Sequence, residues 1–568
     1  MSTSFTRTAS DVFLESLSLG GVDVAFSVFG TDHAGLIESW AKHEATGDMP
    51  KVPRLVLCQH EAVAMNGALG FAHFSGRAQA VIAHVDVGTL NLGAGLHNSM
   101  RNRLPVLIFA GISPWTEGDR FGGRDHYVHW MQDVYDQRGS VRQYVKWEYE
   151  VRTGASFPAA VSRSLQIAHS NPPGAVYMTA AREPLEEAVA EYTYPTMPAP
   201  APTVPPDHIL QDLVTRLRQA KAPLLVTTSG GAEPGAVEAL VAFAETFVVP
   251  VIEIRPFHVN MPSDHTLHQG YITDAKTDLL EQADLVISLD CPIPWVPVIQ
   301  APADDAQVVW IGIDPVDGRI PMRSLRGDMF IQANSRETLN ALTRLGRSTP
   351  AINEVGLRER WDKLAASHKA LHETWDKEAS TDTLTVAHLA KLVAEICGND
   401  ALVINETVTN DTRVLRQLRK RKPGTLMGEA GSGLGLGLSA ALGAKLARPD
   451  ADVVCLQGDG CYIFGSPSAV HWSARAYDAP FLTVILNNGG WRAVARSTAL
   501  MHPDGHSAQA GFPEGRFAAP LDLARTIEAA GGIGLTVNTP EEAKAAITEG
   551  LAKVRAGTSV VINAYVTD

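Results

Sequence analysis

Short, continuous runs of apolar residues alternate along the chain with longer stretches in which apolar residues recur at helical spacing. A continuous apolar run of about four to eight residues is typical of a strand buried on both faces of a parallel sheet, with helices as the crossover connections. Buried strands are therefore predicted at residues 80–85, 105–111, 223–230, 284–290, 308–314, 401–405, 452–460 and 481–488. The pattern predicts an α/β protein.

Two changes in composition divide this pattern. Residues 194–206 carry alternating prolines, which cannot join a sheet ladder or a helix interior, so they predict an extended connector. Residues 346–383 are highly charged with helical periodicity and predict a surface helix between two units. We expect three doubly wound parallel-sheet domains, over residues 1–190, 205–345 and 380–568. A common topology for the first and the third is compatible with the pattern.

Composition narrows the classes of function. The 568 residues are 45% hydrophobic and 19% charged, which predicts a folded protein with several cores. The net charge of −14 offers no general attraction to phosphate backbones or anionic lipid, and no run is long and apolar enough for a membrane span. We expect no nucleic-acid partner and no membrane partner. An odd number of widely spaced cysteines without a CxxC pair favours a reducing, cytoplasmic location.

The strongest chemical signal lies at the ends of two predicted strands in the third domain. Gly458, Asp459 and Gly460 end one strand, and Asn487 and Asn488 end the next, with 26 residues between Gly460 and Asn487. Glycine lets the backbone turn closely around a ligand, and acidic and amide oxygens suit Mg²⁺ and the phosphates that it bridges. Either fragment alone is usually a turn or a cap. Together, at the carboxyl ends of strands, they predict a site for a metal and a diphosphate.

This pair of motifs resembles the diphosphate-binding motif of thiamine diphosphate enzymes, in which GDG is followed by NN. The resemblance implies thiamine diphosphate and Mg²⁺ as cofactors, with Asp459, the Asn488 side chain and the Gly490 carbonyl as metal ligands. Residues 405–409 resemble the segment that accepts the diphosphate, although a helix N-cap explains them equally well. The stretch 428–447 resembles the segment that wraps the cofactor, or it is plain helix packing.

In this family a glutamate of the first domain activates the cofactor by bonding its pyrimidine ring. Glu61 follows the apolar strand RLVLC and begins a helix, where the helix dipole stabilises a carboxylate whatever its role. The segment 80–113 then resembles the next strand, glycine turn, helix and strand of the family, so Glu61 is predicted as the activating acid. The implied cofactor-binding set is Glu61, Asn405, Glu406, Thr407, Ser432, Leu434 (the wedge between the cofactor's rings), Gly458, Asp459, Gly460, Cys461, Asn488, Gly490 and Trp491.

Three further side chains are candidates for catalysis. His84 matches an active-site histidine of benzoylformate decarboxylase and has the right ordinary pKa, about 6.5, to move protons, with a buried structural histidine as the alternative. His33, in the loop at 29–35, loosely matches a histidine of benzaldehyde lyase. Gln132 matches a glutamine of that lyase and of acetolactate synthases. A solvated loop and a helix surface are the plain alternatives for these two.

The resemblance covers almost the whole chain, in the order pyrimidine-binding, central and diphosphate-binding domain, as in acetolactate synthase, benzoylformate decarboxylase and benzaldehyde lyase. It implies a homodimer or homotetramer in which Glu61 of one subunit meets Asp459 of another. The central domain resembles a Rossmann-like unit that holds FAD or ADP in some members and nothing in others.

The implied reaction makes or breaks a carbon–carbon bond next to a carbonyl of a 2-keto acid or 2-hydroxy ketone, as an acetolactate-synthase-like enzyme does. Val494 and the pair His97-Asn98 depart from pyruvate-decarboxylase-type enzymes and disfavour that activity. Residues 31–34, Thr-Asp-His-Ala, replace the Tyr-Pro-Gly-Gly loop of acetolactate synthases, which leaves the substrate open.

Three alternatives remain open from the sequence. A 2-hydroxyacyl-CoA lyase would bind an acyl-CoA through a basic nucleotide pocket, for which Arg319 and Arg323 are the only hint. A benzoylformate-type 2-keto acid decarboxylase is the second. A non-catalytic cofactor-binding subunit is the third, and the retention of Glu61 and Asp459 argues against it.

Overall fold

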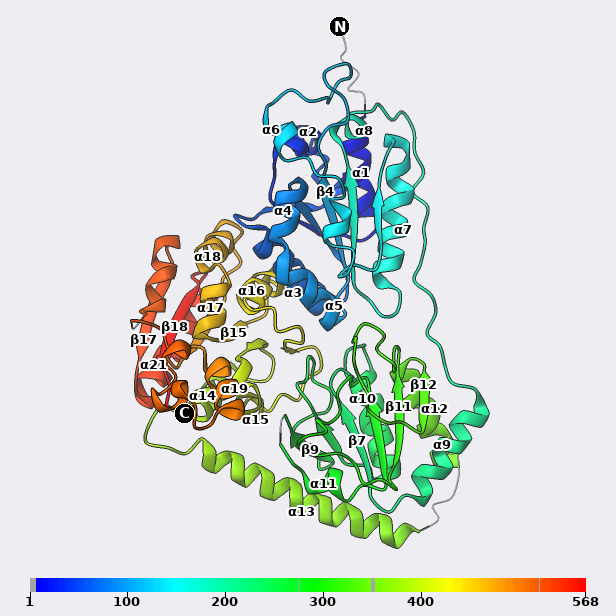
Figure 1. Cartoon of the computed structure of the whole chain (residues 1–568), viewed down its shortest axis with the longest axis vertical. Coiled ribbons are helices and arrows are strands. Elements are labelled where there is room, and N and C mark those ends of the chain that lie inside the picture. Colours follow the sequence, from blue (N-terminus) through cyan, green and yellow to red (C-terminus); the bar gives the residue numbers. More distant parts are fainter. Residues whose placement is uncertain (1–6, 274, 349–352, 520, 568) are drawn as a thin grey trace.

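The computed structural model describes residues 7–273, 275–348, 353–519 and 521–567, which form three six-stranded sheets (Figure 1). Every strand pairing among the named strands is parallel, and helices lie between most consecutive strands, although in the described part of the chain none lies between β8 and β9, β10 and β11, or β11 and β12. The predicted fold class, three doubly wound parallel-sheet α/β units, is confirmed. Among the described residues, no helix combines the length and the apolar character that a bilayer crossing requires.

The first sheet has the strand order β2-β1-β3-β4-β6-β5. Its elements are α1 (Ala9–Leu19), β1 (Val24–Ser27), α2 (Ala34–Thr46), β2 (Arg54–Leu57), α3 (Glu61–Ser75), β3 (Gln79–Ala83), α4 (Val85–Asn91), α5 (Gly93–Asn102), β4 (Val106–Gly111), α6 (Val128–Met131), β5 (Glu148–Glu150), α7 (Phe157–His169), β6 (Ala175–Ala180) and α8 (Arg182–Leu185).

The central sheet has the order β12-β11-β10-β7-β8-β9, the order of a dinucleotide-binding Rossmann sheet. Its elements are α9 (Asp207–Gln219), β7 (Pro223–Thr227), α10 (Ala236–Phe247), β8 (Val251–Glu253), β9 (His268–Tyr271), α11 (Asp278–Glu281), β10 (Leu285–Leu289), β11 (Gln307–Gly312), β12 (Met329–Gln332) and α12 (Ser335–Ser348). The charged stretch predicted as a surface helix forms α13 (Glu354–Glu378), which runs from the central unit to the third (Figure 1). It buries only Leu364 and Trp375.

The third sheet has the order β14-β13-β15-β16-β18-β17, which repeats the order of the first. Its elements are α14 (Val386–Cys397), β13 (Leu402–Glu406), α15 (Asp411–Leu418), β14 (Leu426–Met427), α16 (Leu436–Ala447), β15 (Val453–Gly458), α17 (Asp459–Phe464), α18 (Pro467–Ala476), β16 (Leu482–Asn487), α19 (Arg492–Met501), α20 (His506–Gln509), β17 (Ile533–Val537), α21 (Pro540–Arg555) and β18 (Val560–Tyr565).

Each sheet has one point at which consecutive connections leave in opposite directions. This point lies between β1 and β3 in the first sheet, between β7 and β10 in the central sheet, and between β13 and β15 in the third. The diverging loops open a crevice at the carboxyl ends of the strands, where open α/β sheets bind ligands. The fold therefore offers three places for a site.

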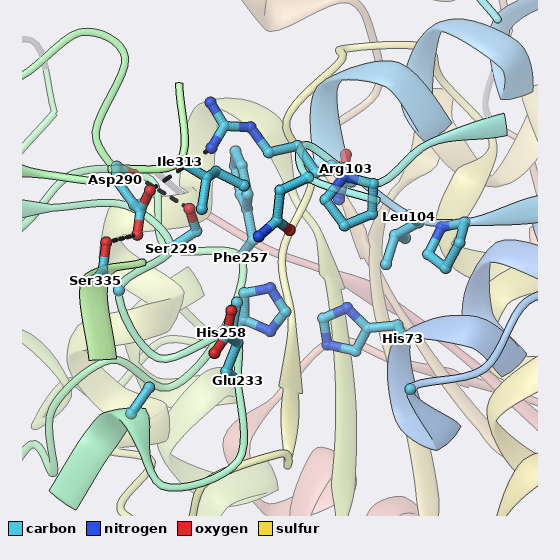
Figure 2. A pocket seen from close by; sticks show the side chains of 18 of the residues that line it. His73, Arg103, Leu104, Ser229, Glu233, Phe257, His258, Asp290, Ile313 and Ser335 are labelled. Carbon is cyan, nitrogen blue, oxygen red and sulfur yellow. Dashed lines mark hydrogen bonds and ion pairs between the residues drawn. The ribbon is translucent and has the colours of Figure 1, made fainter. Parts of the chain in front are cut away.

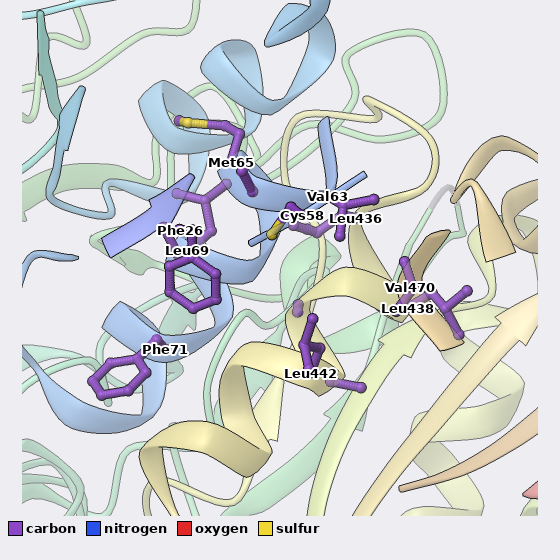
Figure 3. Close-up of a cluster of buried hydrophobic side chains, with 14 of the residues drawn as sticks. Phe26, Cys58, Val63, Met65, Leu69, Phe71, Leu436, Leu438, Leu442 and Val470 are labelled. Atoms are coloured by element: carbon purple, nitrogen blue, oxygen red, sulfur yellow. The ribbon is translucent and has the colours of Figure 1, made fainter. Parts of the chain in front are cut away.

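The first and third units pack through α3 and α16, which lie side by side in Figure 1. A side chain at Gly70 would collide with the backbone of Ala440, and one at Gly443 would collide with the backbone of Gly67. Small residues thus let the two helices approach at backbone distance. Buried side chains flank the contact, with Leu69 on α3 and others on α16 (Figure 3).

Candidate active site

Asp32 and His84 lie at the crevice between β1 and β3. Asp32 belongs to the short 3-10 helix η1 (Thr31–His33) after β1, and only 1% of its surface is exposed. Its Oδ1 is hydrogen-bonded to Nδ1 of His84, the residue directly after β3, and its Oδ2 accepts the Val85 backbone N–H at 3.3 Å. The fold thus joins a buried carboxylate to the predicted proton carrier.

Glu61 faces the same space from the end of β2. It is the first residue of α3 and is buried, as the strand-then-helix pattern predicts. Nδ2 of Asn91 donates to its Oε2 at 3.1 Å, and a Cβ atom at Gly88 would lie 2.8 Å from its Oε1. Its charge also acts on His84, whose pKa it raises. The structure therefore brings Glu61 and His84 together in one chain.

The surroundings of His84 have opposing effects on its pKa. Burial lowers its pKa, but the hydrogen bond and charge of Asp32, with Gln132 and Glu61 adding to them, raise the pKa above its ordinary value. The Gln132 amide is buried beside His84, whose pKa it raises, and neither its oxygen nor its nitrogen has another hydrogen-bond partner among the described residues. We call Asp32, Glu61, His84 and Gln132 the first half-site.

His33 lies behind Asp32. Its side chain is fully buried, its Nδ1 accepts the Gly30 backbone N–H at 3.1 Å, and its Nε2 lies 3.2 Å from Oδ2 of Asp32. The solvated-loop alternative for His33 is therefore wrong, because the loop folds inward as η1. A role for His33 in catalysis stays a prediction.

A carboxylate and two imidazoles near Gln132 could be taken for a metal site. Ligand atoms of Asp125, His126 and His129 lie within 4.8 Å of one another. However, Arg182 forms two hydrogen bonds to Asp125, at 2.9 and 3.0 Å, and holds the pKa of that carboxyl well below its usual range. The guanidinium already occupies the place where a cation would sit.

Asp459 and Asn488 lie at the carboxyl ends of β15 and β16, as predicted. Asp459 is buried, and its Oδ2 accepts the backbone N–H groups of Asn488, Gly489 and Gly490 at 3.2, 2.8 and 3.2 Å. Its Oδ1 accepts the neighbouring Gly460 N–H at 2.7 Å. One carboxylate therefore ties the GDG turn to the NN turn. We call Asp459, Asn488 and Gly490 the second half-site.

The second half-site fits a hard divalent cation. Oδ1 of Asn488 is buried and has no hydrogen-bond partner among the described residues. A buried polar atom without a partner is costly and rare, so it points to a ligand. The oxygen donors here, a carboxylate, an amide and a backbone carbonyl, are those that Mg²⁺ prefers.

Glu406 is engaged within the protein at the start of α16, and a contact with the cofactor stays a prediction. Its carboxylate accepts the N–H groups of Gly435, Leu436 and Gly437 at 2.7 to 3.2 Å, and Nε2 of Gln457 at 2.6 Å. It therefore caps the N-terminus of α16, where a negative charge is stabilised. Burial nevertheless raises its pKa to about 8.

Asn405 and Thr407 flank Glu406 and are also engaged within the protein. Nδ2 of Asn405 donates to Asp411 at 2.7 Å, and the Thr407 hydroxyl donates to Oδ1 of Asn405 at 2.8 Å. Both side chains are buried. They build the floor of the β13–β15 crevice, and a diphosphate contact for them stays a prediction.

The remaining predicted cofactor residues surround this crevice. Leu434 is half-buried and Ser432 is exposed, in the loop that leads into α16. Cys461 is buried in α17. Trp491 covers the GDG turn so closely that a side chain at Gly460 would collide with its ring. Because Gly458 ends β15 just before this turn, the tryptophan closes one side of the crevice.

Two asparagines of the first unit hold the loop before α16, a connection that the sequence does not predict. Asn98 bonds both the carbonyl and the N–H of Gly433, at 2.8 and 3.1 Å. Asn102, one helical turn later on α5, bonds the Gly428 carbonyl and the Ala430 N–H at 3.1 and 3.2 Å. The loop that carries Leu434 is therefore fixed by the first unit of the same chain.

Within one chain, the two half-sites are not joined. No hydrogen bond or ion pair among the described residues connects a first half-site residue with a second half-site residue. Exposed apolar side chains lie on the helices next to each of them: Val87 and Leu90 on α4, whose Asn91 bonds Glu61, and Phe464 on α17, which begins at Asp459.

The central crevice opens into a cavity of about 260 Å³ between the central and first units (Figure 2). The stacked rings of His73 and His258, 4.5 Å apart, form one wall, and Asp290 and Glu233 bring carboxylates to it. Asp290 is held by the Ser335 hydroxyl, and Arg103 lies 3.7 Å away. This cavity is where FAD or ADP would be expected.

The residues of this cavity do not fit a diphosphate. In a nucleotide-binding Rossmann unit, the turn after the first strand offers free N–H groups to phosphate. Here the N–H groups of residues 229–232 donate to Asp290 O, Thr227 Oγ1, Asn260 Oδ1 and Ser229 O at 2.8 to 3.3 Å. The lining cations are paired as well, Arg103 with Asp290 and Asp317, and Arg336 with Glu337.

The two arginines that hinted at a nucleotide pocket serve the fold instead. Arg319 donates to the Val145 carbonyl at 3.4 Å. Arg323 donates to the carbonyls of Pro292 and Pro315, and its guanidinium lies 4.4 Å from the ring centre of Trp310. The acyl-CoA alternative thus loses its only supporting observation.

Comparisons with known proteins agree with this geometry. Three family models match: the N-terminal TPP binding domain of thiamine pyrophosphate enzymes over residues 7–139, their central domain over 210–342, and their C-terminal TPP binding domain over 408–564.

Individual relatives are distant but cover most of the chain. An acetolactate synthase of Mycobacterium leprae is 25% identical over 500 residues, 86% of this chain and 77% of the relative. A benzoylformate decarboxylase of Pseudomonas aeruginosa is 26% identical over 475 residues, 79% and 81% of the two chains. A solved thiamine diphosphate-dependent 4-hydroxybenzoylformate decarboxylase of Rhodococcus jostii superposes with a TM-score of 0.79 at 22% identity, over 99% of each chain.

The three matched domains follow one another along the chain in the order N-terminal, central and C-terminal, and together they span most of it. The chain belongs to the thiamine pyrophosphate enzyme family.

Proposed function

We propose that the protein is a thiamine diphosphate- and Mg²⁺-dependent enzyme that makes or breaks a carbon–carbon bond next to the carbonyl of a 2-keto acid or 2-hydroxy ketone. The observation that carries this proposal is the second half-site, where the buried Asn488 Oδ1 has no partner beside Asp459 among the described residues. Such an oxygen pair suits the metal that anchors a diphosphate.

The residues divide the work of holding the cofactor. Asp459, Asn488 and the Gly490 carbonyl would hold Mg²⁺, and Leu434 would support the rings. When bound, the cofactor supplies a nucleophilic carbon that adds to the substrate carbonyl. Glu61 would form a hydrogen bond with the pyrimidine ring and so determine which ring atom carries the proton. Glu61 is suited to that bond because it is a buried carboxyl group at the N-terminus of α3, where the helix dipole favours a carboxylate.

His84 would move protons to and from the substrate. Its side chain is 19% exposed, and Asp32 raises its pKa toward the range in which general acids and bases work at neutral pH. The Gln132 amide beside it has unused hydrogen-bonding capacity for a substrate oxygen.

The complete site would form between two chains. Within one chain, no hydrogen bond or ion pair among the described residues joins Glu61 to Asp459, and the neighbouring helices α4 and α17 carry exposed apolar side chains. Apolar patches beside incomplete sites are typical of protein–protein interfaces. A homodimer, or a homotetramer built from it, would bring the first half-site of one protomer against the second half-site of its partner and bury these patches.

A benzoylformate-type decarboxylase is the second candidate. The Asp32–His84 pair favours it, because decarboxylation ends with a protonation step and this pair supplies a proton carrier. An acetolactate-synthase-like reaction joins the fragment to an acceptor carbonyl instead. Both types of enzyme occur among the relatives.

The test is turnover by the full-length protein with thiamine diphosphate and Mg²⁺. Pyruvate, benzoylformate and 4-hydroxybenzoylformate are offered with and without an acceptor aldehyde, and CO₂ and products are measured. We expect Glu61→Gln to lower kcat by about 10²- to 10⁴-fold while cofactor affinity, followed by tryptophan fluorescence, changes little.

Glu549→Gln, at an exposed position of α21, is the matched control and should leave turnover unchanged. If no substrate is turned over and Glu61→Gln also leaves every property unchanged, the protein is a cofactor-binding subunit and the proposal is wrong.

A further inference from the structure

We propose that Asp32 is a positioning residue that keeps the hydrogen of His84 on Nδ1, so that Nε2 is the atom that exchanges protons with the substrate. The exchange of protons between His84 and a substrate rests on the proposed function. The placement of the hydrogen rests on the geometry around Asp32 alone.

The contacts of Asp32 define which atoms donate. An ionised carboxylate only accepts hydrogen bonds, so Nδ1 of His84, bonded to Oδ1, must carry a hydrogen. On the other side, Nδ1 of His33 accepts the Gly30 N–H, which leaves the hydrogen of that ring on Nε2, 3.2 Å from Oδ2. Asp32 therefore accepts hydrogen bonds from His84 and from the Val85 N–H, while His33 Nε2 lies 3.2 Å from Oδ2 without forming a hydrogen bond.

These donors also keep Asp32 ionised. Burial favours the neutral acid, but the two imidazoles and the Val85 N–H hold its pKa below the ordinary value. A charged carboxylate with all its partners inside the protein does not need water. It can therefore fix the ring of His84 in one orientation.

The backbone is shaped around this pair. A side chain at Gly30 would collide with the His84 ring, and a side chain at Gly111, the last residue of β4, would collide with the Asp32 carboxylate. The absence of a side chain at Gly30 and at Gly111 thus leaves room for the imidazole and the carboxylate. Such close fitting holds functional groups in a productive geometry.

Other groups near His84 do not replace Asp32. Glu61 approaches from α3 and Gln132 from the segment after α6, while His33 carries no acceptor toward the ring. Glu61 would be engaged with the cofactor. Asp32 is the acidic partner of His84 that the structure shows in a direct hydrogen bond.

The first measurement is the titration of His84 in the full-length protein without cofactor. Histidine labelled with ¹⁵N is observed by NMR, and His84→Gln assigns the signal. We expect the wild-type ring to show Nδ1–H at high pH and its pKa to fall by about 1 unit or more in Asp32→Asn, because a neutral amide replaces the charge. Asp48→Asn, at an exposed position, is the matched control.

The second measurement is the pH dependence of kcat/KM. The acidic limb in Asp32→Asn should move to lower pH together with the NMR pKa, and Asp32→Glu should restore part of the wild-type profile. An unchanged His84 titration in a folded Asp32→Asn variant overturns the proposal, and so does a loss of kcat without any shift in the profile. If the wild type turns over no keto acid, the NMR titration still decides the role of Asp32.

Should Asp32→Asn fail to fold, Gly111→Ala replaces it. The new methyl group displaces the carboxylate from the far side, so the same fall in the His84 pKa is expected. A wild-type pKa in this variant contradicts the proposal.

Discussion

Asn488 is the side chain that most directly indicates a bound metal ion. Its backbone N–H is committed to Asp459, yet its buried amide oxygen has no partner in the described part of the chain. A folded protein avoids such an atom unless something else completes it, because the lost hydrogen bond with water costs about 1 to 3 kcal/mol. We therefore expect a bound cation to complete the contacts of Asp459 and Asn488.

Metal and cofactor binding should stabilise the protein through this pair. At thiamine diphosphate and Mg²⁺ concentrations a hundredfold above Kd, we expect a gain of about 2.7 kcal/mol, seen as a rise in Tm. EDTA should remove the gain in the wild type, and Asp459→Asn should abolish it.

Asp450→Asn is the control for the loss of one carboxylate, because Asp450 is exposed and outside the half-site. A full rise in Tm for Asp459→Asn would mean that the metal is held elsewhere.

Asp32 is the residue that sequence reasoning missed. Nothing in the string FGTDHAG marks the aspartate rather than the histidine beside it. Its partner, His84, lies 52 positions later, and only the pairing of β1 with β3 brings the two together. The backbone partners of Glu406 lie 29 to 31 positions away, so sequence spacing does not reveal them either.

Runs of apolar residues predict interior strands better than edge strands in this chain. The predicted runs coincide with β3, β4, β7, β10, β11, β13, β15 and β16, which lie inside the sheets. The predicted runs omit β5, β12 and β17, which lie at sheet edges and have one exposed or half-exposed face, and they also omit the interior strands β1, β6, β8 and β18. An edge strand needs no continuous apolar run, so its sequence resembles a loop.

The contact of α3 with α16 leaves no room for larger side chains at its glycines. The backbones meet at Gly70 and Gly443, so Gly443→Val must push the helices apart. We expect a loss of about 1 to 3 kcal/mol in the free energy of unfolding, the usual cost of overpacking, measured by urea denaturation.

Because α16 follows the loop with Leu434, Gly443→Val should also weaken cofactor binding. Gly318→Ala is the control, since a side chain there meets open space. Equal stability of the two variants would show that α3 and α16 do not meet at backbone distance.

The whole molecule repeats one design at its two ends. The first and third sheets share a strand order, and each places acidic residues at its own crevice. In the described part of a single chain, no hydrogen bond or ion pair joins the two half-sites at these crevices, so we expect neither to be complete by itself. A symmetric dimer would supply two complete sites, each with one half from each protomer.

Mixing two inactive variants tests this arrangement. Glu61→Gln and Asp459→Asn should each be inactive. After unfolding and refolding together in equal amounts, random pairing should restore about a quarter of the wild-type activity, because each mixed dimer has one intact site. The separately refolded variants are the controls. No recovery in mixtures that contain mixed dimers, or full activity in a sedimenting monomer, would contradict a shared site.

The amino-acid sequence was sufficient for the α/β class, for most interior strands and for the family, because these depend on local runs of apolar residues and on short motifs such as GDG and NN. The partners of each acidic residue required the folded chain. Asp32 meets His84, Glu406 meets the start of α16, and the N–H groups of Ser229 and Gly231 in the central crevice meet Asp290 and Asn260 from distant segments. A hydrogen bond depends on direction and on a few tenths of an ångström, and sequence spacing specifies neither.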